Sequence, residues 1–228
     1  MANVLITGSS SGLGLALAKS FCEQGDEVYG ISRSQTPLPI KQITCNFNQL
    51  DTLKESLSEL IQNISFDYVF LNAGLLGKIE VVSKLSHDDF LSVFNVNVFA
   101  NKIIIDALLR NNNVKNIIGI SSGAALKTYF GWSIYCTSKA AFKQLISAYA
   151  DENPTTHFLN LAPGIVKTKM QDHLYSLDAT EIPSLEKFHS LYNTMETPEI
   201  VAKRIIENLT PLGTLPSGSF FDLRDINS

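Results

Sequence analysis

The sequence predicts a doubly wound α/β fold in one domain spanning residues 1–228, with a parallel sheet of about seven strands and helices on both faces. The first observation is that short apolar runs alternate with segments of helical periodicity along the chain, an order typical of such sheets. The second is that 228 residues, 45% of them hydrophobic, suffice for one large core. The third is a glycine-rich turn directly after the first apolar run.

The individual elements follow from periodicity and from helix start signals. Ser86 three residues before Asp89, and Thr197 before Pro198, are signals of this kind. The proline-rich segment Ser34–Lys41 is too short for a helix. The expected strands are Val4–Thr7, Glu27–Ser32, Gln42–Cys45, Tyr68–Asn72, Asn116–Ser121, His157–Ala162 and Ser219–Asp222. The expected helices are about Leu13–Glu23, Leu50–Ile61, Asp88–Leu109, Ile134–Asp151 and Pro198–Leu209.

The glycine-rich turn is Gly8-Ser-Ser-Ser-Gly12-Leu-Gly14, between an expected strand and an expected helix. A turn that opens a helix offers unpaired backbone N–H groups and the positive helix end to a phosphate. The turn therefore indicates a dinucleotide site. Taken alone, a glycine-rich turn is also consistent with a purely structural role.

A phenol and an ammonium lie four residues apart at Tyr135 and Lys139, in a stretch with helical periodicity. Side chains at i and i+4 share one helix face. We expect the ammonium to stabilise the phenolate and to draw the pKa of Tyr135 down from its usual value near 10. Tyr135 is therefore a candidate general acid.

These residues belong to an ordered set of markers that resembles the short-chain dehydrogenase/reductase family from Asn3 to about Glu207. The markers are Thr7-Gly-x3-Gly12-x-Gly14, Asn72-Ala-Gly74, Asn97, Ser121-Ser122, Tyr135-x3-Lys139, and Pro163-Gly164 with Thr168. The resemblance implies a Rossmann-type fold, a nicotinamide cofactor and the catalytic residues Asn97, Ser122, Tyr135 and Lys139. Ser122 is preferred to Ser121 because it precedes Tyr135 by the family's usual thirteen residues.

The end of the second expected strand bears on the choice of cofactor. An NAD enzyme normally has an acidic residue there, whereas this chain has Ser32 and Arg33. A guanidinium can bind a 2′-phosphate with paired hydrogen bonds, so we expect NADP(H) rather than NAD(H). The alternative is that Arg33 is a solvated loop cation. The expected cofactor-binding residues are Gly8, Ser10, Ser11, Gly12, Leu13, Gly14, Ser32, Arg33, Asn46, Phe47, Asn72, Ala73, Gly74, Tyr135, Lys139, Pro163, Gly164, Val166 and Thr168.

The resemblance also implies a mechanism of carbonyl reduction. The nicotinamide supplies hydride, Tyr135 donates the proton, and Ser122 holds the carbonyl oxygen. Asn97 would help to hold a water that links Lys139 to solvent. The alternative for Asn97 is that it only satisfies a neighbouring backbone group.

A narrower resemblance concerns the substrate. Ser122-Gly-Ala-Ala-Leu126, Gly131-Trp-Ser-Ile-Tyr135 and Ser217-Gly-Ser-Phe-Phe-Asp222 resemble the sepiapterin reductase and benzil reductase branch. This implies a small-molecule carbonyl substrate, namely a vicinal dicarbonyl on a pterin side chain or between aromatic rings. The expected substrate residues are Ser122, Trp132, Tyr135, Met170 and Asp222, with residues 169–195 as a mobile lid.

Two of these substrate assignments have alternatives. Trp132 and the nearby Tyr129 are equally consistent with core or subunit-contact aromatics. Asp222 resembles the aspartate that anchors the pterin in sepiapterin reductase, but pairing with Arg224 or Lys203 at the surface is the other interpretation.

Composition and the resemblance bear on the binding partners, the location and the alternative functions of the protein. The net charge of −4 argues against nucleic acid or an anionic membrane as the main partner, and we expect no membrane span and no signal peptide. Three scattered cysteines show neither pairing nor metal spacing and favour a cytoplasmic location. The resemblance implies a homodimer or homotetramer. A non-catalytic dinucleotide sensor would normally lose Tyr135 or Lys139, and an epimerase or dehydratase usually needs a larger carboxyl-terminal domain.

Overall fold

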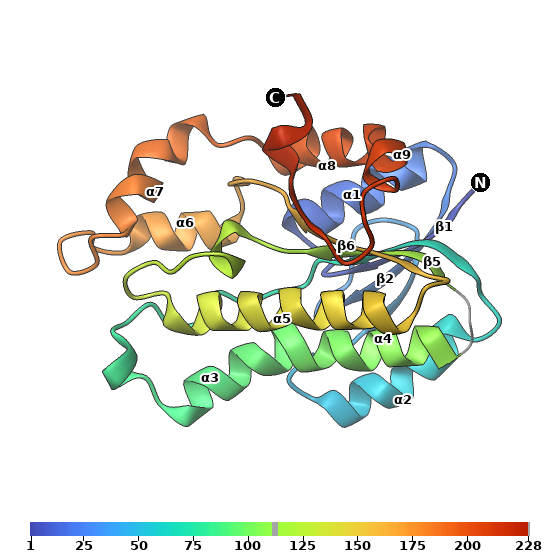
Figure 1. Ribbon diagram of the computed structural model, residues 1–228, viewed down its shortest axis with the longest axis horizontal. Helices are drawn as coiled ribbons and strands as arrows, with labels where there is room; N and C mark the ends of the chain where they lie inside the picture. The colour runs from blue at the N-terminus through green and yellow to red at the C-terminus, as the bar shows by residue number, and fades with distance from the viewer. Residues whose placement is uncertain (111–113, 228) are drawn as a thin grey trace.

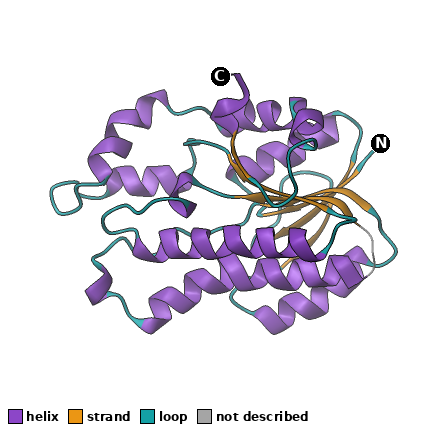
Figure 2. Cartoon of the chain, in the orientation of Figure 1, coloured by secondary structure: helices purple, strands orange, loops and turns teal. Residues whose placement is uncertain are grey.

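The computed structural model describes residues 1–110 and 114–227, and it shows a seven-stranded parallel sheet with helices on both faces (Figures 1 and 2). The strand order is β3-β2-β1-β4-β5-β6-β7. The strands are β1 (Asn3–Thr7), β2 (Glu27–Ser32), β3 (Lys41–Thr44), β4 (Phe66–Leu71), β5 (Val114–Ile120), β6 (His157–Ala162) and β7 (Phe220–Asp222). The predicted fold class is confirmed.

The helices form one layer on each face of the sheet (Figure 1). In the part of the chain that the structure describes, the α-helices are α1 (Gly12–Glu23), α2 (Leu50–Ile61), α3 (His87–Phe94), α4 (Ala100–Arg110), α5 (Ser133–Glu152), α6 (Lys169–Ser176), α7 (Leu185–Leu191), α8 (Pro198–Glu207) and α9 (Leu209–Leu212). Helices α1 and α8 cover one face, and α2, α4 and α5 cover the other. As predicted, the segment between β2 and β3 contains no helix.

The two layers have separate cores because side chains alternate along each strand. On β1, Val4 and Ile6 pack against the α1 and α8 side, whereas Leu5 packs against the α2, α4 and α5 side. All three side chains are fully buried. A strand covered on both faces is apolar throughout, which explains the continuous hydrophobic run Val4–Ile6.

The single helix expected at Asp88–Leu109 is instead two α-helices joined by a π-helical turn at Asn95–Phe99. The N–H of Ala100 donates to the carbonyl of Asn95, five residues back. A single π turn inside a long apolar helix has no residue signature of its own, so the sequence pattern did not reveal it. Its consequence is the position of Asn97, described below.

The same helical stretch, His87–Arg110, is long and apolar enough to cross a membrane by length and composition alone. Half of its most apolar 18-residue window is buried inside the protein, and the core helix of a globular protein passes the same test. Our expectation that no stretch approaches a membrane span counted uninterrupted apolar residues. The mean hydropathy of the helix reaches 1.3 although it contains asparagines. A criterion of uninterrupted apolar residues therefore overlooks this helix as a candidate span.

Candidate active site

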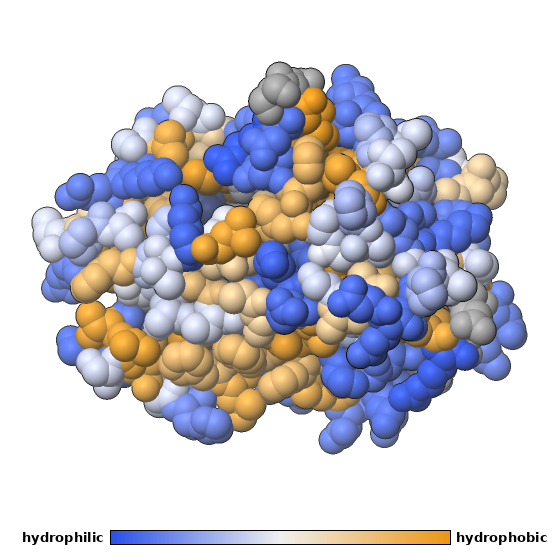
Figure 3. Space-filling model, viewed as in Figure 1, coloured by the Kyte–Doolittle hydropathy of each residue, from blue (hydrophilic) through white to orange (hydrophobic). Residues whose placement is uncertain are grey.

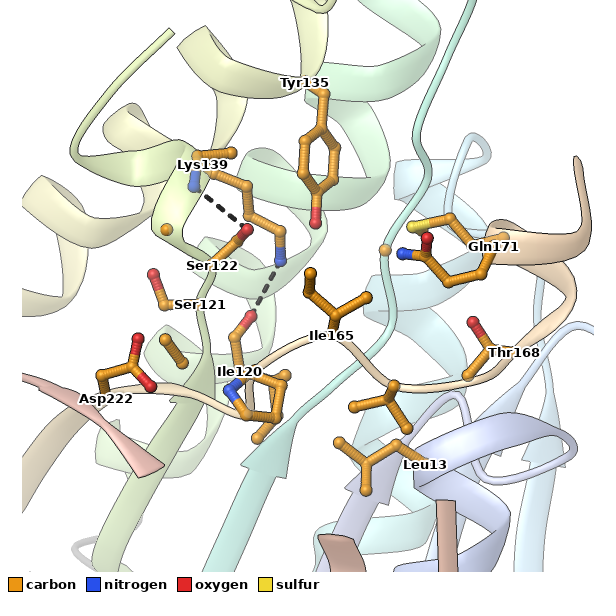
Figure 4. Close-up of a pocket in the computed structure, with 18 of the residues that line it drawn as sticks. Leu13, Ile120, Ser121, Ser122, Tyr135, Lys139, Ile165, Thr168, Gln171 and Asp222 are labelled. Atoms are coloured by element: carbon orange, nitrogen blue, oxygen red, sulfur yellow. Dashed lines mark hydrogen bonds between the residues drawn. The ribbon is translucent and has the colours of Figure 1, made fainter. Parts of the chain in front are cut away.

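A cavity lies at the carboxyl edge of the sheet, where ligands of doubly wound folds bind. The chain leaves β1 towards β2 and β3 on one side and later returns to β4 on the other, so the strand order reverses at β1. The lining comes from the ends of β4, β5, β6 and β7 and from helices α1, α5, α6 and α7 (Figure 4). Segments distant in sequence therefore meet at one site.

The glycine-rich turn is held tightly against the end of β4. The Thr7 hydroxyl oxygen accepts hydrogen bonds from the backbone N–H groups of Asn72 and Ala73, both at 2.9 Å. Gly8 has φ +72°, and a Cβ on Gly14 would lie 2.3 Å from the Gly8 carbonyl oxygen. No side chain caps the N-terminus of α1. Free N–H groups on a backbone with no room for side chains suit the pyrophosphate of a dinucleotide.

Tyr135, Lys139 and Ser122 converge on the cavity (Figure 4). Tyr135 and Lys139 are one turn apart on α5, and the Lys139 Nζ lies 5.8 Å from the centre of the Tyr135 ring. The ammonium donates a 2.8 Å hydrogen bond to the carbonyl of Ile120, at the end of β5. The Ser122 hydroxyl accepts from the N–H of Ala124 at 3.1 Å, which fixes its position.

Burial has the largest effect on the pKa values of Tyr135 and Lys139. Desolvation raises the pKa of Tyr135 to about 12, although a hydrogen bond with Ser122 opposes the rise. Desolvation also lowers the pKa of Lys139 to about 8. The expectation that Lys139 draws the pKa of Tyr135 below its usual value was therefore wrong for this structure, because burial favours the uncharged phenol. At neutral pH Tyr135 holds its proton, as a proton donor must.

Asn97 anchors the loop after β4. Its side chain donates to the Leu75 carbonyl at 2.9 Å and to the Ser138 hydroxyl at 2.9 Å, and it accepts from the Leu75 N–H at 2.7 Å. Its own carbonyl accepts from the side chain of Asn101 at 2.9 Å. These bonds match the alternative interpretation, in which Asn97 satisfies neighbouring groups. They also fix the backbone at Gly74, where a Cβ would lie 3.4 Å from the Asn97 Oδ1.

The expected adenine end of the site is more open. Arg33 is exposed and makes no hydrogen bond or ion pair with any residue that the structure describes. Ser32 is buried and donates to the Ser34 carbonyl at 2.6 Å. Asn46 is exposed, whereas the Phe47 side chain belongs to the core. A cofactor could therefore contact Phe47 only through its backbone.

The cavity gathers about half of the expected cofactor residues. Those in its lining are Leu13, Asn72, Gly74, Tyr135, Lys139, Pro163, Gly164, Val166 and Thr168. Those outside it are Gly8, Ser10, Ser11, Gly12, Gly14, Ser32, Arg33, Asn46, Phe47 and Ala73. Gly12 nevertheless approaches this wall, since a Cβ there would lie 3.2 Å from the Thr168 methyl group.

An aromatic cluster forms the wall beneath α7. Trp132 is buried and stacks on Phe188, with ring centres 4.6 Å apart. Tyr129 lies 5.3 Å from Trp132 and 5.6 Å from Phe188. The indole N–H of Trp132 donates to the Ser184 hydroxyl at 3.0 Å. Trp132 is thus a core residue that also lines the cavity.

All five expected substrate residues line the cavity, and sequence reasoning missed several others. The five are Ser122, Trp132, Tyr135, Met170 and Asp222. The missed lining residues include Lys127, Gln171, Lys187, Phe188 and Arg224. The side-chain oxygen of Gln171 is buried and has no partner among the described residues. No sequence signal distinguishes these side chains from other polar or apolar residues of the same segments.

Asp222 is paired with Arg224. The guanidinium donates to Asp222 Oδ1 from Nε at 2.8 Å and to Oδ2 from Nη2 at 2.6 Å. The Arg224 N–H also donates to Oδ1 at 3.1 Å. The side-chain hydrogen bond from Arg224 lowers the pKa of Asp222 against the opposing effect of burial. Lys203, the other partner considered, bonds Glu207 instead.

Within residues 1–110 and 114–227, no group of three or more His, Cys, Asp or Glu side chains could hold a metal ion.

Comparison with known proteins places the chain in a family. The model of the short chain dehydrogenase family matches residues 2–178. A benzil reductase ((S)-benzoin forming) of Bacillus cereus is 30% identical over 96% of this chain and 97% of its own length. A benzil reductase of Saccharomyces cerevisiae is 33% identical over 84% and 82%, and an NADPH-dependent pterin aldehyde reductase of Arabidopsis thaliana is 28% identical over 91% and 88%.

The fold agrees with these matches. The solved structure of a short chain dehydrogenase family protein from Francisella tularensis superposes with a TM-score of 0.84 at 23% identity, covering 97% of this chain and 96% of that one. The glycine-rich turn, the Tyr135 and Lys139 pair on α5 and the parallel sheet thus occur together in a chain that belongs to the short-chain dehydrogenase/reductase family of oxidoreductases.

Proposed function

We propose that the protein is an NADP(H)-dependent carbonyl reductase that converts a vicinal dicarbonyl compound, such as an aromatic diketone, to the hydroxyketone. The observation that carries the proposal is the protonated Tyr135 phenol beside Ser122 and Lys139, in a cavity adjoining the glycine-rich turn. The benzil reductases among the relatives support the substrate class.

Each catalytic residue of the cavity has its own role in the proposed reaction. The nicotinamide supplies hydride to the carbonyl carbon. The Ser122 hydroxyl holds the carbonyl oxygen, and Tyr135 donates its proton to the oxygen as negative charge develops there. Lys139 lies against the ring of Tyr135 and favours the phenolate that remains. One carbonyl, one hydride and one proton give one alcohol, and NADPH becomes NADP⁺.

The preference for NADP(H) is supported by the end of β2. Arg33 is exposed and unpaired among the described residues, and the preceding Ser32 brings no negative charge. A guanidinium in this state can bind a 2′-phosphate without first breaking another ion pair. The printed name of the Arabidopsis relative, an NADPH-dependent reductase, agrees with this choice.

The aromatic cluster supports a flat apolar substrate. Tyr129, Trp132 and Phe188 line the same cavity as Tyr135. Aromatic rings of a diketone would bury apolar surface against them. Residues 169–195, which contain α6 and α7, would close over the substrate as a lid.

A pterin is the second candidate substrate, because the Arabidopsis relative is named for a pterin aldehyde and Asp222 lines the cavity. Arg224 already occupies both oxygens of Asp222, so the paired donors of a pterin edge would have to displace it. If Asp222 anchors a pterin, Asp222→Asn lowers kcat/KM for sepiapterin but not for benzil.

The surface and composition support a location and an assembly state. We include in the proposal a cytoplasmic homodimer or homotetramer, formed through the face that contains α4 and α5. Apolar side chains gather on the face over α3, α4 and α5 (Figure 3), and Leu91 and Phe99 are exposed there.

The test is NADPH and NADH consumption with benzil, sepiapterin and simple monoketones, using the unmodified protein and Tyr135→Phe. The variant keeps the ring packing and loses the proton, so activity falls by about 100- to 10,000-fold while NADPH affinity changes little. Near-normal turnover by Tyr135→Phe contradicts the mechanism. NADPH binding without turnover of any carbonyl favours the non-catalytic sensor.

A further inference from the structure

The wall of the cavity is cationic, although the chain as a whole carries a net charge of −4. Its charged side chains, among the described residues, are Lys127, Lys139, Lys187, Arg224 and Asp222. Four cations and one carboxylate give the lining a formal charge of +3. A cleft whose walls carry one sign of charge concentrates ligands of the opposite sign.

Two of the four cations already have hydrogen-bond partners within the protein. Arg224 forms a two-pronged ion pair with Asp222, and Lys139 is buried beside Tyr135 with its ammonium on a backbone carbonyl. Lys127 and Lys187 differ from both. They are exposed, and neither forms an ion pair with any carboxylate that the structure describes.

The aromatic cluster fixes the two segments that carry these lysines. The Lys127 Nζ lies 5.6 Å from the centre of the Tyr129 ring, a cation–π distance. Lys187 precedes Phe188 on α7, and the stacking of Phe188 on Trp132 fixes that turn of the helix. The two ammonium groups are thus carried by elements that pack on one another.

These elements belong to the substrate side of the cavity. Lys127 lies between β5 and α5, and Lys187 lies on α7, segments that contain none of the residues expected to bind the cofactor. The reacting groups Tyr135 and Lys139 are 8% and 5% exposed at the base of the cavity. The two free ammonium groups therefore mark the mouth, away from the carbonyl that is reduced.

We propose that the preferred substrate is a carbonyl compound that carries a carboxylate remote from the reacting carbonyl, and that Lys127 and Lys187 bind this carboxylate at the mouth. The inference rests on the proposed carbonyl reductase function and narrows its substrate class. The carboxylate takes no part in the reaction: hydride and proton add to the distant carbonyl as before. Its binding replaces solvent around two ammonium groups that have no carboxylate of the protein to pair with.

The experiment compares 4-carboxybenzil with its methyl ester, which share the diketone and differ in charge. Assays use NADPH with the unmodified protein and with Lys127→Gln/Lys187→Gln. Lys54→Gln, exposed on α2 and outside the cavity lining, is the control for a changed net charge. We expect the unmodified protein and Lys54→Gln to favour the acid by about tenfold or more in kcat/KM at low salt. The preference falls as salt is added and approaches one in the double variant.

Other outcomes separate this inference from the function on which it rests. Turnover of the ester with no preference for the acid, or a preference that the double variant retains, overturns the inference and leaves the reductase function standing. Turnover of neither compound, nor of benzil, overturns the proposed function itself. A raised NADPH KM in the double variant, with the acid preference intact, overturns the inference because the lysines would then serve the phosphates of the cofactor.

Discussion

Burial moves the two ionisable side chains on α5 in opposite directions. It raises the pKa of Tyr135 to about 12 and lowers that of Lys139 to about 8. Both shifts favour the neutral forms, because an uncharged phenol and an uncharged amine cost least in a dry environment. The raised pKa keeps the phenol protonated, so that it can donate a proton. The buried ammonium, in contrast, lowers the free energy of unfolding.

That cost leads to a prediction for Lys139. An unfolded lysine titrates near 10.5, so between pH 8 and 10 the unfolded chain binds more protons than the folded one, and stability rises with pH there. Below pH 8 the buried charge costs about 3 kcal/mol. We expect Lys139→Met to be inactive but more stable than the unmodified protein in urea at pH 7. The difference should shrink by about 1 kcal/mol at pH 9. A difference independent of pH contradicts the assignment.

The cofactor preference depends on Arg33. Because its guanidinium is exposed and unpaired among the described residues, Arg33→Ala should raise the KM for NADPH at least about tenfold and leave that for NADH nearly unchanged. Steady-state kinetics with both cofactors provide the measurement. Ser32→Asp should shift preference towards NADH by repelling the 2′-phosphate. An equal response of both cofactors to Arg33→Ala would show that Arg33 is a solvated cation.

At the scale of elements, one hydroxyl connects the proposed lid to the rest of the cavity wall. Ser184 precedes α7, accepts from the indole N–H of Trp132 at 3.0 Å and donates to the Phe130 carbonyl at 2.7 Å. The bonds connect α7 to the segment before α5. Buried Leu174 and Leu185 pack into the same cluster, so the two lid helices share their core with the wall of the cavity.

Ser184→Ala should therefore loosen α7. The indole N–H of Trp132 loses its partner, which costs about 1–3 kcal/mol for a buried donor. We expect a lower Tm and a several-fold higher KM for the diketone, with the KM for NADPH unchanged. Ser190→Ala is the matched control, since Ser190 is exposed on the same helix and, among the described residues, donates only to the Lys187 carbonyl. Equal effects of both variants would argue against a bridging role for Ser184.

At the scale of the molecule, the α4 and α5 side of the sheet carries exposed aromatic surface. On the α4 and α5 side, Phe99 is 41% exposed and lies 6.3 Å from Phe94, which is 6.5 Å from Phe90. These rings belong to α3 and the π turn, over which apolar side chains gather in Figure 3. Burying these rings against a second copy would remove apolar area from water, which favours assembly.

Phe99→Asp should accordingly dissociate the proposed oligomer. A carboxylate in an apolar interface cannot be paired there, and its desolvation opposes association. Sedimentation velocity at micromolar concentration measures the outcome. Ile200→Asp serves as the control because Ile200 is 50% exposed on α8, on the other face of the sheet. If both variants sediment like the unmodified protein, the assembly does not use this face.

The sequence by itself determined the fold class, the order of strands and helices along the chain, and the placement of Tyr135 and Lys139 on one helix. These depend on local periodicity and on spacing along one helix, which neighbouring residues encode. The turn at Gly8–Gly14 could be assigned to a phosphate for the same reason. The outer ends of the predicted strands and helices lie within two residues of those observed, whereas α6, α7, α9 and the π turn were not predicted.

Only the tertiary structure decided what surrounds those residues. Sequence spacing placed Lys139 beside Tyr135, but it could not show that both are buried deeply enough for desolvation to shift both pKa values towards the neutral forms. It could not show that Arg224 forms an ion pair with Asp222, or that Lys127 and Lys187 line the same cavity. The physical reason is that burial and pairing depend on contacts between segments distant in sequence, and the packing of the folded chain creates those contacts.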